Sequence, residues 1–265
     1  MNAAKPSDKN HNVYFVPGLH RGLRLLELLA RSNETMTVSE LAQRLELSRS
    51  SAFRLVYTLQ YLGFLTTSDD RTFQLGARVL NLGFSFLAKQ DILQVARRDL
   101  EELRDLCGIS THLAIRDGLD ILFLDCIQTR TGFLSNVNVG ARLPAYASPM
   151  GWVMLSELPN RELIALHKEI PFEPFTEGTP SGIAELMQLV AKSSADGYVL
   201  SHGVVEQGGA SVTAPIFDRS GNIVAAIDIS GPQSAFDQDK LDSFYIPAVR
   251  DAAGKISRRL GNAGN

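Results

Sequence analysis

The sequence predicts an α+β protein with a helical N-terminal part and a larger C-terminal part built on an antiparallel sheet flanked by helices. Two observations support this. Through residues 19–62, apolar residues recur at the spacing of amphipathic helices. Beyond residue 110, short alternating runs separated by Gly and Asp are typical of antiparallel strands. The 265 residues, of which 45% are hydrophobic and 21% charged, suffice for about two domains.

The chain is expected to begin with a flexible arm and a first helix. Residues 1–17 are polar, contain two prolines and show no periodicity, which predicts the arm. From Leu19 a leucine stripe predicts the helix, and Arg21 lies on another of its faces.

Two further helices have clear start signals. Thr37 and Glu40 form the pattern of a capping box, which begins the second helix. After a turn, Ser48 is placed to cap a third helix. The third helix has an apolar stripe of Ala52, Leu55, Val56, Leu59 and Leu62, and an opposite face of Arg49, Ser50, Ser51, Arg54, Tyr57 and Thr58. This layout is typical of a helix-turn-helix, although a helical hairpin with a solvated polar face also fits the spacing.

The next segment favours the DNA-binding interpretation. Residues 64–67 and 72–75 alternate as strands around a turn at 68–71, and a hairpin directly after a recognition helix is a wing. We therefore predict a winged helix-turn-helix over residues 18–75. Arg71 could enter a minor groove, although Asp69 and Asp70 would repel phosphate. The predicted contacts with double-stranded operator DNA are Arg21, Arg49, Ser50, Ser51, Arg54, Thr58 and Arg71.

The charge distribution agrees with a DNA-binding N-terminal part. Residues 1–90 carry 11 Lys and Arg against 7 Asp and Glu, whereas residues 91–265 carry 15 against 22. A basic part beside an acidic one fits a polyanion-binding domain joined to a domain that does not touch DNA.

Residues 76–90 are predicted to form a linker helix that is apolar nearly all round. Such a helix must be buried, and a second copy of the chain is a natural partner. Burial against its own wing is the alternative.

Residues 91–265 are predicted to form a separate sensing domain. The expected helices are 91–107, 149–158, 181–196 and 237–260, and the expected strands are 111–116, 119–127, 133–139, 198–201, 210–217 and 223–230. Ser148 is placed to cap the helix that starts with Pro149, whose free N–H groups could bind a carboxylate, with Tyr146 and Met150 packing on its body. A plain helix cap with both side chains in the core is the alternative.

Several dispersed motifs resemble the IclR family of bacterial transcriptional regulators. They are the segment 48–55, the run Arg71-Thr-Phe-Gln-Leu-Gly-Ala-Arg-Val-Leu, the run from Gly140 to Gly151 containing Leu-Pro-Ala-Tyr-Ala-Ser-Pro-Met-Gly, and Ala226-Ile-Asp-Ile-Ser-Gly-Pro. The resemblance implies a winged helix-turn-helix, a dimerising linker and a GAF-like effector domain in a dimer or dimer of dimers. It also implies control of catabolic genes by small organic acids.

The resemblance further implies an effector pocket. We expect it to involve Leu143, Tyr146, Ser148, Met150, Gly151, Ser201, His202, Ser211, Thr213, Asp228 and Ser230. The family commonly has acidic residues where this chain has Ser201-His202-Gly203-Val204, and this departure favours an anionic ligand. His202 and Asp228 could equally make structural hydrogen bonds.

Other function classes have little support in the sequence. The five histidines lie in no catalytic motif, and no Walker or Rossmann pattern occurs, which argues against an enzyme. Cys107 and Cys126 lie in no metal-binding motif, and no run approaches a membrane span, so we expect no cofactor, metal or membrane partner and a cytoplasmic protein. A protein-interaction module stays open, and steep salt dependence would distinguish DNA binding from it.

Overall fold

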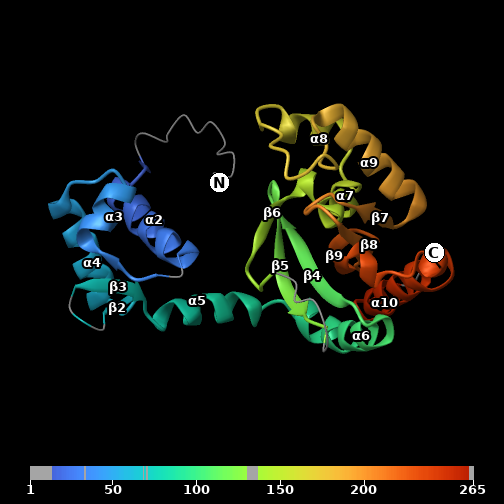
Figure 1. Ribbon diagram of the computed structural model, residues 1–265, viewed down its shortest axis with the longest axis horizontal. Coiled ribbons are helices and arrows are strands. Elements are labelled where there is room, and N and C mark those ends of the chain that lie inside the picture. The colour runs from blue at the N-terminus through green and yellow to red at the C-terminus, as the bar shows by residue number, and fades with distance from the viewer. Residues whose placement is uncertain (1–13, 33, 68, 70, 130–136, 263–265) are drawn as a thin grey trace. The chain divides into compact units, whose positions relative to one another are not determined.

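The computed structural model describes residues 14–32, 34–67, 69, 71–129 and 137–262, and its contacts divide the chain after Gln90 into two units (Figure 1). The N-terminal unit contains α2 (Pro17–Arg31), β1 (Met36–Thr37), α3 (Val38–Arg44), α4 (Arg49–Tyr61), β2 (Leu65–Thr67), β3 (Thr72–Leu75) and α5 (Arg78–Leu87). Most of the predicted arm lies outside the described residues. Its last residue, Pro17, already belongs to α2, because proline is favoured in the first turn of a helix.

The start signals of both inner helices are confirmed. Thr37 Oγ1 accepts from the Glu40 N–H at 3.3 Å, and Glu40 Oε2 accepts from the Thr37 N–H at 2.7 Å, which is the complete capping box. Ser48 Oγ accepts from the Ser51 N–H at 3.2 Å and so caps α4.

The predicted wing is present, with one strand more than expected. β1 pairs with β3, giving a three-stranded antiparallel sheet in the order β1-β3-β2. Asp69 closes the β2–β3 turn, since its Oδ1 accepts hydrogen bonds from the Arg71 and Thr72 N–H groups and from Thr72 Oγ1. These bonds, led by the Thr72 N–H, lower the pKa of Asp69. The Asp69 carboxylate therefore has a structural role in the turn.

The linker helix α5 is anchored at its first residue. Arg78 Nη1 donates to the carbonyl oxygen of Leu62 at 2.8 Å, and the guanidinium lies 5.4 Å from the centroid of the Phe64 ring. The structure buries no residue of α5, so burial against its own wing is not what this structure shows. The exposed large apolar residues of α5 are Leu80, Leu82, Phe84 and Phe86.

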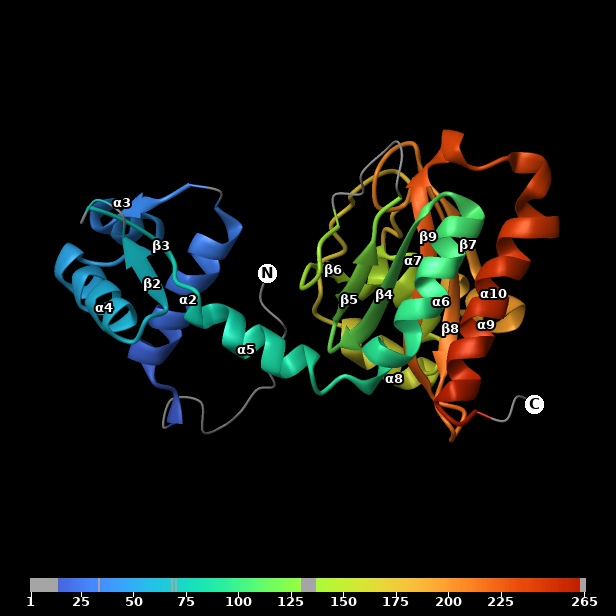
Figure 2. The same cartoon turned by 90° about the horizontal axis from the view of Figure 1, so that it is seen from below.

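The C-terminal unit is a six-stranded antiparallel sheet between two layers of helices. Its elements are α6 (Asp91–Cys107), β4 (Ser110–Asp117), β5 (Asp120–Ile127), β6 (Arg142–Pro144), α7 (Pro149–Leu155), α8 (Asn160–His167), α9 (Ile183–Asp196), β7 (Val199–His202), β8 (Gly209–Phe217), β9 (Ile223–Pro232) and α10 (Ile246–Arg259). The strand order is β6-β5-β4-β9-β8-β7. Helices α6 and α10 pack together on one face, and α7 and α9 cover the other (Figure 2).

The structure differs from the sequence expectations at four places. The predicted strand 133–139 falls mostly outside the described residues, and Val137–Val139 is not a strand. Strand β6 and helix α8 were not predicted. Helix α7 ends at Leu155 instead of Leu158, and the Ser148 side chain does not cap it. Finally, α10 begins at Ile246 because Pro247 fits only the first turn of a helix, and residues 238–245 form 3₁₀ and π-helical turns before it.

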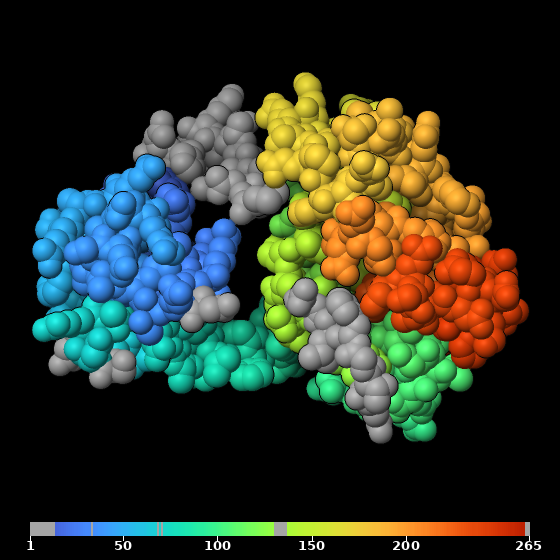
Figure 3. All heavy atoms as spheres, viewed as in Figure 1, coloured from blue at the N-terminus to red at the C-terminus, as the bar shows by residue number. Residues whose placement is uncertain are grey.

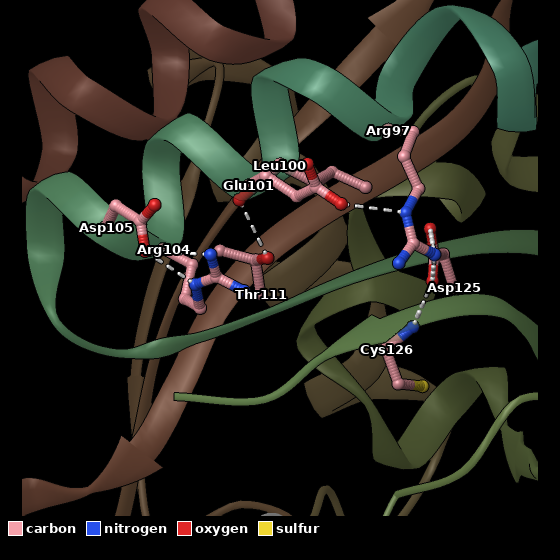
Figure 4. Close-up of polar contacts among 8 residues, drawn as sticks. All are labelled: Arg97, Leu100, Glu101, Arg104, Asp105, Thr111, Asp125 and Cys126. Carbon is pink, nitrogen blue, oxygen red and sulfur yellow. Dashed lines mark hydrogen bonds and ion pairs between the residues drawn. The ribbon is translucent and has the colours of Figure 1, made fainter. Parts of the chain in front are cut away.

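Polar contacts hold α6 against the sheet (Figure 4). Arg97 Nη1 lies 3.0 Å from both carboxylate oxygens of Asp125 on β5, and Thr111 Oγ1 donates to the Leu100 carbonyl at 3.1 Å. On the other side of α6, Arg259 of α10 pairs with the buried Asp99. None of the helices in the described parts of the chain is long and apolar enough to cross a membrane.

Gly151 provides a test of the packing around α7. A Cβ atom at this position would lie 2.1 Å from the carbonyl oxygen of Ala145, so Gly151→Ala requires the backbone to move. We expect a loss of roughly 1–3 kcal/mol in the free energy of unfolding, the usual cost of overpacking. Urea denaturation measures it.

The matched control is Gly254→Ala, which lies inside α10 of the same unit. Its Cβ would meet only the flexible end of Arg258 at 3.4 Å. This variant should be about 0.5–1 kcal/mol more stable than the parent, because alanine restricts the unfolded chain. Equal stabilities of the two variants would show that the close approach at Gly151 is wrong.

Candidate recognition helix and effector pocket

Helix α4 presents a basic and hydroxyl-bearing face to solvent. Its buried residues Ala52 and Val56 fix the face that meets the core. The opposite, exposed face carries the predicted contacts Arg49, Ser50, Arg54 and Thr58. Within the described residues, neither guanidinium of α4 takes part in a hydrogen bond or ion pair. Figure 3 shows the light-blue atoms of α3 and α4 uncovered at the surface of the N-terminal unit.

The remaining predicted DNA contacts lie elsewhere or are engaged locally. The Ser51 hydroxyl accepts from Ser48 Oγ at 2.9 Å and belongs to the helix cap. Thr58 Oγ1 donates to the Arg54 carbonyl of its own helix at 2.8 Å. Arg71 is exposed on the wing and Arg21 on α2. The structure thus gathers Arg49, Ser50 and Arg54 on one helix face and leaves the two other arginines on separate elements.

The same face of α4 also carries exposed aromatic side chains. Phe53 is 58% exposed, Tyr57 62% and Tyr61 82%. The sequence analysis placed Tyr57 on this face but did not single out Phe53 or Tyr61. The signal was present, because the three residues follow each other at four-residue spacing outside the buried stripe.

The C-terminal unit contains a cavity of about 230 Å³ against the sheet face that α7 covers. Its apolar wall includes Phe123, Val137, Leu143, Pro149, Met150, Val204, Val205 and Ala210, and its polar wall includes Ser148, Ser201, Ser211, Asp228, Ser230 and Glu206. Of the predicted pocket residues, the cavity brings together Leu143, Ser148, Met150, Ser201, Ser211, Asp228 and Ser230. A small molecule with an apolar body and a polar group at its edge would match these two walls.

Strand register explains the polar wall. Ser230, Ser211 and Ser201 lie directly opposite one another on β9, β8 and β7. Directly opposed residues share a face of the sheet, so the three hydroxyls point to the same side. The Ser201 and Ser211 hydroxyls are 2.9 Å apart and hydrogen-bonded.

The neighbouring row of the sheet contains a histidine that the sequence analysis missed. His112 lies opposite Asp228, which in turn lies opposite Thr213. His112 Nδ1 is 2.8 Å from Asp228 Oδ1 and 3.2 Å from Ser230 Oγ, and its ring meets Phe123 edge-on. In the described part of the chain, the buried His112 Nε2 and Thr213 Oγ1 have no hydrogen-bond partner. The available signal was a histidine directly before the apolar residues Leu113, Ala114 and Ile115 of its strand.

Four of the predicted pocket residues do not line the cavity. Tyr146 is buried, its hydroxyl donating to the Glu173 carbonyl at 3.1 Å and accepting from the Glu173 N–H at 2.9 Å, and burial raises its pKa. Gly151 packs against the backbone of Ala145. His202 is exposed at the end of β7, and Thr213 lies opposite Asp228 on the same face of the sheet without lining the cavity. The four residues therefore surround the cavity without forming its wall.

The charges around the cavity are acidic. Asp228 and Glu206 line it, and none of its lining residues is Lys or Arg. Hydrogen-bond donors come from the serine hydroxyls and from the start of α7, where the Met150 N–H group has no acceptor in the described structure. Burial, followed by the Asp228 charge, raises the pKa of Cys126 to about 12, so this thiol is neutral. No three potential metal-binding side chains cluster among the described residues.

Both units resemble known transcriptional regulators. Residues 18–69 match the IclR helix-turn-helix domain, and residues 84–258 match the C-terminal domain of the bacterial transcriptional regulator IclR. The HTH-type transcriptional repressor AllR of Salmonella typhi is 30% identical over 92% of this chain and 89% of its own length.

Solved structures agree with this assignment. One from Rhodococcus sp. RHA1, named as a transcriptional regulator, is 34% identical and superposes with a TM-score of 0.81 over 93% of this chain and 98% of its own. An IclR homologue of Microbacterium hydrocarbonoxydans, solved with 4-hydroxybenzoate, is 25% identical with a TM-score of 0.79 over 92% of this chain and 98% of its own. With its fold and both domains matched, this chain belongs to the IclR family of transcriptional regulators.

Proposed function

We propose that the protein binds operator DNA through α4 and that a small organic acid in the C-terminal cavity controls this binding. The observation that supports DNA binding is the exposed face of α4, where Arg49 and Arg54 have no ion pair within the described unit. An arginine can donate two hydrogen bonds to O6 and N7 of a guanine in the major groove, and Ser50 can donate to a phosphate or base.

The other basic residues of this unit would position the duplex. Arg71 on the wing reaches toward a minor groove, and Arg21 on α2 meets a phosphate. The hydrogen bonds of the turn lower the pKa of Asp69 and keep its carboxylate negatively charged, so Arg71 is a secondary contact. Ser51 and Thr58 border the contact and keep the helix ordered.

The apolar surface of α5 supports self-association. Four large apolar side chains are exposed on a ten-residue helix, and exposed apolar surface of this kind marks an interface. Two copies of the chain joined through α5 would present two recognition helices to the half-sites of a pseudo-palindrome.

A solved relative supports an organic acid as the controlling ligand. The neighbour from Microbacterium was solved with 4-hydroxybenzoate, an acid with an uncharged polar end. In this chain the acid's carboxylate would meet the Ser148 hydroxyl and the free N–H group of Met150. Its opposite, hydroxyl-bearing end would donate to Asp228, because a carboxylate accepts hydrogen bonds.

Arginine variants test the DNA interface. An operator is first selected from a random-sequence duplex library with the full-length protein, and its affinity is measured by fluorescence anisotropy at several salt concentrations. Arg54→Ala and Arg49→Ala should each weaken specific binding by about 1–3 kcal/mol, because a bidentate contact with a base is lost. The control Arg161→Ala removes the same charge from the exposed surface of α8. Wild-type operator affinity in both α4 variants would contradict the interface.

Thermal unfolding with pairs of carboxylic acids and their primary amides tests the pocket. An acid present at one hundred times its dissociation constant adds roughly 2.7 kcal/mol to the stability of the native state, enough to raise the Tm by several degrees. Ser148→Ala and Ser211→Ala should abolish the shift. Ser220→Ala, in the β8–β9 turn away from the cavity, should retain it. Equal shifts from an acid and its amide, or no shift with any acid, would contradict an anionic ligand.

A further inference from the structure

The exposed aromatic residues on α4 have no structural explanation within their own unit. The helix meets its core through Ala52 and Val56, and the core of the unit is made without Phe53, Tyr57 or Tyr61. More than half of each aromatic side chain is exposed. Because exposing aromatic rings is unfavourable, a set of them on one face marks a surface that becomes covered by a partner.

The position of Phe53 and Tyr57 indicates which partner covers them. Tyr57 lies four residues after Phe53 and three after Arg54, so the Tyr57 side chain neighbours both of the others on the exposed face. Ser50 and Arg49 lie one turn before them. The two rings therefore lie on the same surface as the guanidinium and hydroxyl groups that would face the major groove. DNA is the partner that fits a surface of aromatic, cationic and hydroxyl groups.

Only one major-groove feature is apolar. Each base pair presents donors and acceptors at its edge, and thymine alone adds a C5-methyl group, which aromatic and aliphatic side chains contact. We propose that Phe53 and Tyr57 read thymine methyl groups beside the guanine that Arg54 contacts. This inference rests on the proposed operator binding by α4 and adds a sequence preference to it.

Tyr61 lies on the same face of α4 but is not expected to contact a thymine methyl group. Recognition helices place their N-terminal residues against the base edges. Tyr61 lies eight residues beyond Phe53, about 12 Å further along the helix axis, and is the last residue of α4. It therefore lies beyond the bases and provides an aromatic control on the same helix.

The experiment removes single methyl groups from the DNA. The operator selected with the full-length protein is resynthesised with one thymine at a time replaced by deoxyuridine, and each dissociation constant is measured by anisotropy. One or two thymines in each half-site, next to the guanine on which Arg54 depends, should lose about fourfold in affinity, the effect of one apolar carbon group leaving water. Thymines elsewhere should show no change.

Protein variants then assign the contact to the rings. In Phe53→Ala and Tyr57→Ala the penalty for deoxyuridine should disappear at the thymine that each ring covers. Tyr57→Phe keeps the ring and should keep the penalty, as should Tyr61→Ala. Since all three aromatic residues are exposed and alanine favours helices, these variants are expected to fold.

The possible failures are distinguishable. If the protein binds its operator and Arg54→Ala weakens it, but no deoxyuridine costs more than twofold, the methyl contact is wrong while the operator binding stands. A penalty that survives in both alanine variants also overturns it. A change in sedimentation of Phe53→Ala and Tyr57→Ala without a change in base preference would assign the rings to a protein interface instead. If no sequence is selected at all, the operator proposal fails and this inference fails with it.

Discussion

The antiparallel pairing of β4 with β9 is the constraint on which the sensing unit depends. It joins His112 to Asp228, residues 116 positions apart, and puts both on the sheet face that forms the cavity. The same register aligns Ser110 with Ser230, and through β8 it aligns Ser211 and Ser201. A shift of one residue would move the entire polar set to the opposite face, against the apolar side of α6 and α10.

A bulge in β5 places Phe123 and Asp125, two residues apart, on opposite faces of the sheet. The register shifts between Leu113 and Ala114, so Asp125 pairs with Leu113 while Phe123 pairs with Ala114. Phe123 therefore lines the cavity, whereas Asp125 binds Arg97 of α6 on the other side. Only three residues separate α6 from α5 in the chain, and α5 is fixed to the end of α4 by Arg78. Asp125 thus joins the strand that lines the cavity to α6 by an ion pair, and Arg78 joins α5 to the end of α4 by a hydrogen bond.

The sequence was most informative where local chemistry decides the structure. The capping box at Thr37 and the cap at Ser48 each depend on side chains a few residues apart, and both were predicted correctly. Helix α6 was predicted to the residue. The family relationship was also recognisable, because its motifs are spread in order along the chain.

The sequence was least informative where contacts between residues far apart in the chain decide the structure. Strand β6 is three residues long and forms by pairing with the edge of β5. It is too short to show a periodicity in the sequence. The role of His112 depends on a partner 116 positions away. Tyr146 looked like a ligand contact, but its hydroxyl is satisfied by the backbone of Glu173, which no local pattern reveals. Ser148 looked like a cap because it precedes Pro149, yet its hydroxyl makes no capping bond and lines the cavity instead.

The central claim is that a ligand in the cavity changes how the protein binds DNA. The most direct measurement is the operator affinity of the full-length protein with and without a saturating acid that raises its Tm, with Ser211→Ala as the pocket control. We expect a change of fivefold or more, the lower end of typical coupling between sites, and no change in Ser211→Ala. An operator affinity that stays constant while the acid is bound would contradict it.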